Sequence, residues 1–378
     1  MEKGLRRQGF AEPERVPYTF GVHPVLYAKV IKLREKLRQL RQDIEARSTD
    51  FDHEKHWKPW HGKEERTEVA AGDGSFNYAR RLGFWLVGAT ASGVYSGKNA
   101  GDVFLGELDI IRLGEMEEDC VRALMQSGSK IMEAKALALA ADRITGGLVM
   151  ADGALSGLMR NYTEDMGKGR IAGLAGLALG EEEKLFRWAN ELAWEMAGDP
   201  SAWTSWALKE RAFSLEEDRR FAVGILMALA RQEYLLALKG LLARNAERMV
   251  GIAKTSADCS ILDGIPDIYL LSLKTRASGF TEPKPVNMPQ EEGLPMLACS
   301  SFYARLEEGY GVMKVEVFSE PEAVDPPAIL ARLLATSVSG YPYPLSKAHN
   351  LCSLSFSALE KYLGLAGGKH EPSGREGL

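Results

Sequence analysis

The chain has 378 residues, of which 45% are hydrophobic and 26% are charged, and its formal net charge is -5. This ordinary globular balance excludes a disordered or fibrous protein, and it supplies enough apolar side chains for a core without disulfides or a structural metal. The mild acidity argues neither for nor against nucleic acid, because a local basic surface is what meets the phosphates.

The N-terminal part, residues 1–50, is expected to be an irregular arm followed by one helix. Prolines interrupt residues 1–24. Beyond them, apolar residues alternate spacings of four and three, which is an a/d seam: Leu26, Val30, Leu33, Leu37, Leu40 and Ile44. Such a helix either packs on its own domain or contacts a second copy or a partner protein.

Residues 52–66 are polar, rich in His and Trp, and expected to form a loop. Two functions are conceivable for this loop. The spacing of His53 and His56, with His61 nearby, would suit a zinc site if the segment were helical. Alternatively, Trp57 and Trp60 could stack on DNA bases.

A series of strands and one long helix follows. The β-formers predict strands at 68–76, 82–95 and 102–112, and the glycines in the second strand suggest bends. A helix over 115–143 has an acidic first turn, and a fourth strand covers 147–151. We expect the first three strands to form an antiparallel meander and the fourth to return beside the first, which is the order of an RNase H-like mixed sheet.

The rest of the second domain, 51–365, is expected to alternate helices and strands. Residues 155–250 form a large helical insertion, including a helix at 181–197 and another opened by a capping box at Ser214 and Glu217. Strands are predicted at 249–254 and 313–318, separated by a proline-rich loop at 281–296. A helix starts at Asp325-Pro326-Pro327, another covers 346–363, and 366–378 form a flexible tail.

The cysteines and the hydropathy pattern indicate a cytoplasmic protein. Four widely scattered cysteines, without a C-x-x-C pair, are expected to be reduced thiols: Cys120, Cys259, Cys299 and Cys352. No apolar segment follows the charged N-terminus, and no run approaches the ~18 apolar residues of a membrane span, so no membrane association is expected.

Two Asp-Gly pairs are candidates for metal binding. Asp73 and Asp152 each end a predicted strand, and each is followed by glycine, which allows a sharp turn or close approach of a ligand. Asp-Gly often marks only a turn. Two such carboxylates in adjacent strands would nevertheless point to one place, where they could hold one or two divalent ions.

Three further residues could take part in the chemistry. Glu133 lies on the long helix, with Lys130 one turn earlier, and the two are either a surface pair or part of the site. Lys254 ends a strand, where a lysine can contact a phosphate. Ser346 is expected to cap the last helix, which would place His349 in its first turn, either as a packed histidine or as a metal ligand or proton carrier.

These segments resemble the NurA family of archaeal and bacterial nucleases. The matching motifs occur in family order: Asp73-Gly74-Ser75, the helix with Lys130 and Glu133, VMADGAL ending at Asp152, VGIAKTS with Lys254, and GYPYPLSKAH with His349. Lys130 stands where the family carries an arginine, and Glu107 is our choice for a further family acidic residue.

The resemblance implies a DNA nuclease that uses Mn²⁺ (or Mg²⁺) and has an RNase H-like fold. Asp73, Glu133, Asp152 and His349 would be metal ligands, while Lys130 and Lys254 would contact DNA. It also implies a homodimer that acts with the HerA translocase, a hexameric ATPase, in DNA-end resection, with 5′–3′ exonuclease and single-strand endonuclease activity. The alternatives are a non-catalytic DNA-end or translocase-binding subunit on this fold, and a different RNase H-like enzyme.

Overall fold

The computed structural model describes residues 24–97, 99–161, 166–176, 181–193, 202–215, 218–289 and 294–367. The chain divides into two compact units, Met1–Phe51 and Asp52–Leu378. Most of the arm predicted for residues 1–24 and most of the predicted tail, from residue 368 on, lie outside the described residues. The capping-box residue Glu217 lies outside them as well.

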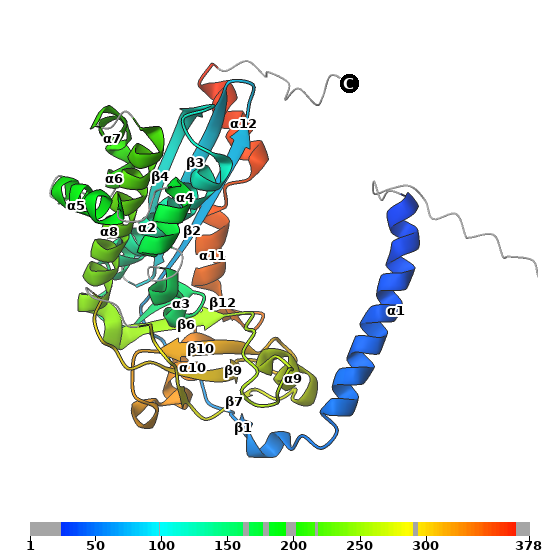
Figure 1. The fold of residues 1–378 in the computed structure, drawn as a ribbon. Helices are drawn as coiled ribbons and strands as arrows, with labels where there is room; N and C mark the ends of the chain where they lie inside the picture. The colour runs from blue at the N-terminus through cyan, green and yellow to red at the C-terminus, as the bar shows by residue number, and fades with distance from the viewer. Residues whose placement is uncertain are drawn as a thin grey trace, which may run out of the picture. The chain divides into compact units, whose positions relative to one another are not determined.

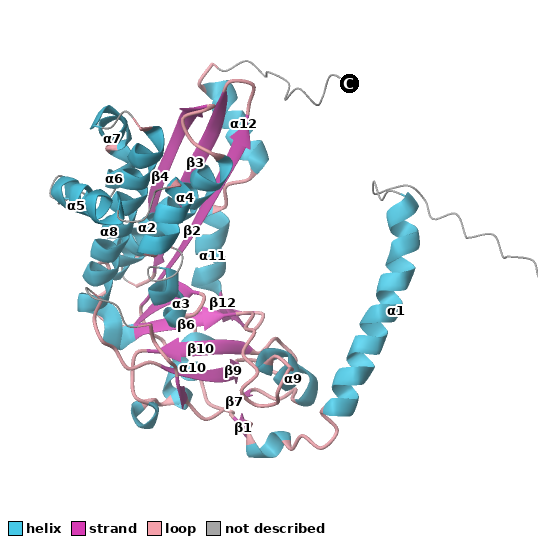
Figure 2. Ribbon diagram, viewed as in Figure 1, coloured by secondary structure: helices cyan, strands magenta, loops and turns pink. Residues whose placement is uncertain are grey.

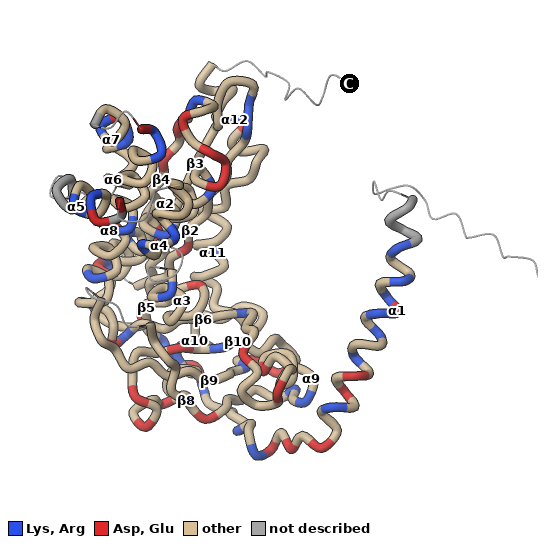
Figure 3. The backbone as a smooth tube through the Cα atoms, viewed as in Figure 1, with Lys and Arg blue, Asp and Glu red and all other residues tan. Residues whose placement is uncertain are grey.

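The described part of the first unit is mainly helix α1 (Pro24–Arg47). Lys and Arg recur along this helix (Figure 3). Its apolar seam is exposed, with four seam side chains each about half accessible to solvent: Val30, Leu33, Leu37 and Leu40. The helix thus presents an apolar stripe flanked by positive charge.

The second unit is built on a mixed β-sheet with helices on its faces (Figures 1 and 2). In spatial order its strands are β1 (Lys58–Pro59), β7 (Gly279–Phe280), β9 (Ser300–Arg305), β10 (Met313–Val317), β6 (Met249–Ala253), β5 (Leu148–Asp152), β2 (Val69–Arg80), β3 (Phe84–Tyr95) and β4 (Gly101–Arg112). A further strand, β8 (Lys284–Pro285), pairs with β9. The predicted α/β class is therefore confirmed.

The first five predicted elements are also confirmed in their order and pairing. Strands β2, β3 and β4 form an antiparallel meander, helix α2 (Glu118–Ala141) follows, and β5 returns parallel to β2. One boundary was wrong: β2 does not end at Phe76 but continues to Arg80. The Asp-Gly-Ser segment runs straight through this strand because each of its residues pairs with β3.

Glycines on one face of the meander let α2 pack very close to it. A Cβ atom at Gly72 would lie 2.9 Å from Leu137 Cβ, and one at Gly93 would lie 2.3 Å from Ala136 O. These contacts are too short for a side chain. The bends expected from glycines in the second strand are therefore wrong; β3 is continuous, and Gly93 serves helix packing instead.

The segment between β5 and β6 is helical, as predicted. It contains α3 (Leu155–Arg160), α4 (Lys168–Ala175), α5 (Glu181–Ala193), α6 (Thr204–Ala207), α7 (Lys209–Leu215), α8 (Arg219–Asn245) and the 3-10 helix η4 (Ala246–Arg248). The predicted cap was wrong, because Ser214 lies inside α7 and the N-cap of α8 is Asp218. The Asp218 carboxylate accepts a hydrogen bond from the Arg220 amide at 2.9 Å.

Helix α8 holds no unbroken run of ~18 apolar residues, as expected, yet it resembles a membrane span in length and average composition. By length and composition alone, Arg219–Arg248 could cross a membrane, and most of it is buried inside the protein. Helices α2, α4, α5 and α7 pack around α8, so its all-round apolar surface is that of a core helix.

The C-terminal part contains α9 (Asp267–Lys274), the 3-10 helix η5 (Pro321–Ala323), α10 (Pro326–Leu334), the hairpin β11 (Ser337–Val338) and β12 (Tyr341–Pro342), α11 (Tyr343–Cys352) and α12 (Phe356–Leu365). The single helix predicted for 346–363 was wrong. Pro344 lies in the first turn of α11, and Ser355 caps a separate helix by accepting from the Ala358 amide. Helix α9 and strand β9 have no counterpart among the predicted elements.

Candidate metal centre

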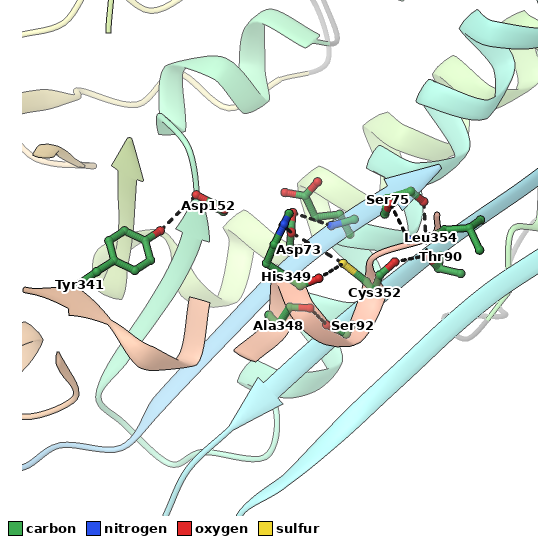
Figure 4. Close-up of polar contacts among 12 residues, drawn as sticks. Asp73, Ser75, Thr90, Ser92, Asp152, Tyr341, Ala348, His349, Cys352 and Leu354 are labelled. Carbon is green, nitrogen blue, oxygen red and sulfur yellow. Dashed lines mark hydrogen bonds and ion pairs between the residues drawn. The ribbon is translucent and has the colours of Figure 1, made fainter. Parts of the chain in front are cut away.

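Asp73 and His349 form the centre of the candidate site (Figure 4). Asp73 is buried on β2, and His349 reaches it from α11, with its Nδ1 atom 2.7 Å from Asp73 Oδ2. The other carboxylate oxygen, Oδ1, accepts a hydrogen bond from the Gly74 amide at 2.8 Å. The histidine side chain is 61% exposed, so this ring faces solvent on one side.

Asp152 joins the pair from the adjacent strand. Strands β2 and β5 are parallel with Gly72 opposite Ala151, so the next position places Asp73 beside Asp152. Ligand atoms of Asp73, Asp152 and His349 all lie within 4.8 Å of one another. The predicted proximity of the two carboxylates is confirmed, although only Asp152 ends its strand. Gly153, with φ of 101°, then turns the chain away.

Burial and the charge of Asp73 raise the pKa of Asp152, while the positive charge of Lys254 opposes this rise. Removing two nearby carboxylates from water without a cation is unfavourable. The donor set of two carboxylates and one imidazole fits Mn²⁺, because carboxylate oxygens suit Mn²⁺ and Mg²⁺ and imidazole is a common ligand of transition-metal ions. A cation at this position would relieve the repulsion between the carboxylates.

Tyr341, which was not among the predicted site residues, connects Asp152 to Lys254. Its hydroxyl donates a hydrogen bond to Asp152 Oδ1 at 3.3 Å, and Lys254 Nζ lies 4.0 Å from the centroid of its ring. Burial raises the pKa of the Tyr341 hydroxyl, so it remains a proton donor at neutral pH. The signal was available, since Tyr341 belongs to the same GYPYP segment that drew attention to His349.

Glu133 approaches from the α2 face of the sheet. It is 3% exposed, and Lys130 Nζ lies 2.8 Å from its Oε2 atom. Burial raises the pKa of Glu133, and the Lys130 charge opposes that rise; the charges of Asp73 and Asp152 raise the pKa further. The two residues are therefore not a solvent-facing pair, as one alternative held. Glu133 lies near the carboxylates but outside the group of three that meet within 4.8 Å.

The position of His349 within its helix differs from the prediction. Ser346 is not a cap but an interior residue of α11, and His349 lies in the last turn of that helix. Two hydroxyls on β3 hold α11 in place: Ser92 Oγ donates to Ala348 O at 2.7 Å, and Thr90 Oγ1 donates to Cys352 O at 2.6 Å (Figure 4).

Glu107 lies away from this centre. It is on the edge strand β4, where burial and the charge of Asp109 raise its pKa while Lys209 opposes the rise. Among the described residues, the group of ligand atoms near Asp73 does not include it. The choice of Glu107 as a further acidic ligand finds no support in this geometry.

The His/Trp-rich segment forms neither of the two sites that were considered for it. Among the described residues, no metal-ligand group contains His53, His56 or His61, so the zinc alternative is not supported. The rings of Trp57 and Trp60 are buried, at 4% and 9% exposure. Because buried rings cannot stack on a base, the DNA-stacking alternative is wrong for this conformation.

Comparison with known proteins identifies similar chains. The NurA domain family model matches residues 67–354. The chain is 25% identical over 371 residues to the DNA double-strand break repair nuclease NurA of Saccharolobus solfataricus, covering 91% of this chain and 95% of that protein. It is 30% identical over 151 residues to the protein of the same name from Sulfurisphaera tokodaii, covering 38% of this chain and 44% of that one.

Two solved structures have the same fold. The crystal structure of the NurA nuclease from Sulfolobus solfataricus superposes with a TM-score of 0.64 at 22% identity, covering 92% of this chain and 97% of that one. A structure of NurA bound to dAMP and manganese gives a TM-score of 0.63 at 16% identity, covering 94% and 99% of the two chains.

Proposed function

The chain belongs to the NurA family, and we propose that it is a DNA nuclease whose reacting centre is formed by Asp73, Asp152 and His349. The observation that carries this proposal is the convergence of three ligand atoms within 4.8 Å, contributed by β2, β5 and α11. The relatives of similar length are named as DNA double-strand break repair nucleases. DNA is therefore the substrate class, and hydrolysis of a phosphodiester bond is the reaction.

Manganese, or magnesium in its place, is the expected cofactor. A relative was solved with manganese and dAMP. When bound, a divalent ion acidifies a water and stabilises the charge that develops on the leaving oxygen. Asp73, Asp152 and His349 would hold one ion. Glu133 would become a further ligand when its carboxylate leaves Lys130, which completes the set expected for a centre with two ions.

The remaining residues bind and orient the substrate. Lys254, whose ammonium group lies over the Tyr341 ring, would contact a phosphate beside the reacting one. Tyr341 would fix the Asp152 carboxylate through its hydroxyl and Lys254 through its ring. Lys130 would offer a single positive charge to the DNA, without the two-pronged grip of an arginine. In the hydrolysis, the oxygen of water forms a bond to phosphorus, and the bond between phosphorus and the leaving oxygen breaks. The leaving oxygen then takes up a proton.

We interpret the mixed sheet as an RNase H-like core. The strand order β3, β2, β5, with α2 as the crossover, supports this interpretation. The helices of 155–250 would be an insertion in a nuclease domain of 51–365, with residues 1–50 as a separate arm and 366–378 as a tail. The close Gly72 and Gly93 contacts let α2 pack against the sheet, which supports a position of Glu133 near Asp73 and Asp152.

We further propose a cytoplasmic homodimer that works with a HerA-type translocase in DNA-end resection, cutting in the 5′–3′ direction and within single strands. The exposed seam of α1 supports a contact with a second copy or with the translocase, because about half of each of four seam side chains is accessible: Val30, Leu33, Leu37 and Leu40. The polarity and the partner rest on family membership.

Purified protein assayed on end-labelled single- and double-stranded DNA tests the proposed function. Cleavage should require manganese and should disappear in Asp73→Asn, which keeps the volume of the side chain but removes its charge. Wild-type protein that binds DNA ends but cleaves neither substrate, with manganese or magnesium, would instead identify the non-catalytic subunit.

A further inference from the structure

A cavity of about 360 Å³, lined mostly by polar and charged residues, lies on the opposite face of the sheet from Asp73 and His349. Strands β8, β9 and β10 form its floor, and α3 with the loop after β6 forms its walls. Gly251 shows which face of the sheet carries the cavity. A Cβ atom at Gly251 would lie 2.7 Å from the Leu155 amide nitrogen, so this face of β6 packs against the start of α3. Helices α10 and α11 pack on the other face, through Leu330 and Leu345.

The floor of this cavity is a complete polar network. Lys314, only 8% exposed, places its ammonium group 2.6 Å from Asp258 and 2.7 Å from Glu316. Glu316 is fully buried and accepts hydrogen bonds from the amide and the hydroxyl of Ser156. Buried charges of this kind are stable only when all of them are paired, so the floor is rigid.

Two side chains at the rim, Lys284 and Asn287, are not paired in this way. Within the described part of the chain, Lys284 makes no ion pair and the Asn287 amide makes no side-chain hydrogen bond. Arg160, which interacts with Asp258, lines the same cavity. The hydroxyl of Ser301 and the apolar side chain of Val286 also line the cavity. Cations beside hydroxyl, amide and apolar groups suit a phosphate with its sugar and base.

Both walls of the cavity begin at the candidate metal centre. Helix α3 starts at Leu155, directly after Asp152 and its turn, and the other wall follows Lys254. In the sheet, Lys314 pairs with Ala253, the residue before Lys254. Since neighbouring strands are about 4.8 Å apart, the cavity floor begins one strand away from the end of β6.

We propose that this cavity binds a nucleotide of the DNA strand that flanks the reacting phosphate, held by Lys284, Asn287 and Arg160. The inference rests on the proposed nuclease function for the identity of the ligand. The chemistry shared by its possible sources is a nucleoside monophosphate, which is either part of the strand or a released mononucleotide. The strand is favoured because both cavity walls lead directly from Asp152 and Lys254.

A binding experiment without metal tests the cavity independently of catalysis. Fluorescence anisotropy of a labelled oligo-dT strand is measured in EDTA for wild type, the double variant Lys284→Gln/Asn287→Ala, and the control Lys239→Gln. Lys239 is an exposed lysine on α8 and does not line the cavity. We expect the double variant to bind about tenfold more weakly, with a smaller salt dependence, and the control to bind like wild type.

Two further arms separate the outcomes. Hydrolysis of the nitrophenyl ester of thymidine monophosphate should be unchanged in the double variant, while KM for oligo-dT rises, because the small ester does not reach the cavity. Unchanged oligo-dT affinity, or loss of free dTMP binding with full retention of oligo-dT binding, would overturn the proposal. A wild-type protein that cleaves nothing refutes the nuclease function, yet the anisotropy comparison still decides whether the cavity binds a strand.

Discussion

Gly74 and Glu133 are so close that any larger residue at the strand position would force the neighbouring helix to shift. A Cβ atom at Gly74 would lie 3.1 Å from Glu133 Cβ and 2.7 Å from the backbone oxygen of Ser129. Gly74 is thus the point at which α2 presses against β2, one residue after Asp73. The glycine after this aspartate serves the approach of a helix, rather than a turn.

Substituting this glycine should therefore disturb the centre from the far side of the sheet. Gly74→Ala must push the backbone of α2 away, and we expect a loss of stability of about 1–3 kcal/mol, as for other overpacked sites. Cleavage per folded molecule should also fall, because Glu133 moves with α2. Gly83→Ala is the control, since a Cβ atom there meets nothing within 4 Å. Equal melting temperatures for both variants would contradict the packing argument.

Without metal, the charged side chain of Asp152 should make the wild-type protein less stable than a variant with a neutral side chain at this position. The carboxylate is partly buried beside Asp73, and both effects raise its pKa. We expect Asp152→Asn to melt at the same temperature as wild type or higher without metal, but to lose the rise in melting temperature that manganese gives wild type. Calorimetry with and without manganese measures both. A manganese-dependent rise that survives in the variant would remove Asp152 from the ligand set.

His349→Ala should separate a metal ligand from a packed histidine. Because the ring is mostly exposed, its removal should leave the metal-free melting temperature nearly unchanged. If the ring binds the ion, the manganese concentration needed for half-maximal cleavage should rise about 10–100-fold, the range seen when groups that support a bound metal are lost. Lys347→Ala, two residues earlier on α11, is the control. An unchanged manganese dependence leaves only the carboxylates as ligands.

Tyr341→Phe tests the link between Asp152 and Lys254. The variant keeps the ring under Lys254 but removes the hydrogen bond to Asp152, so it should weaken metal binding more than DNA binding. Lys254→Gln should show the reverse pattern, with KM for DNA raised and the manganese dependence unchanged. Measuring the manganese dependence and KM in both variants distinguishes the two roles; identical profiles would mean that the residues act as one unit.

Deleting residues 1–50 tests the exposed seam of α1. Sedimentation of the full chain should give a dimer, and the deletion should weaken the dimer or its complex with the translocase, because the apolar stripe lacks cover. The milder variant Leu33→Ser/Leu37→Ser should act in the same direction. A deletion protein that remains dimeric and still binds the translocase would show that the seam has no role in assembly.

The sequence by itself determined the meander, the crossover helix and the pairing of Asp73 with Asp152. Those features depend on local strand and helix signals and on the rule that a helical crossover returns its strand in parallel. The parallel register of β2 and β5 then places Asp73 beside Asp152. The same local signals failed where one residue pair is compatible with two structures. The Asp-Gly pair at 73–74 was interpreted as the end of a strand, but it lies inside β2, where the glycine allows α2 to approach.

Only the tertiary structure decided the rest of the centre. Tyr341 and His349 are more than 180 residues from Asp152 along the chain, and no local pattern measures the distance between them. The position of His349 depends on which residue starts α11. Pro344 favours a start at Tyr343, and the hydroxyls of β3 hold the helix in place by donating hydrogen bonds to its carbonyl oxygens. Similarly, Glu133 is buried because glycines elsewhere let α2 approach, and such a contact exists only after the chain has folded.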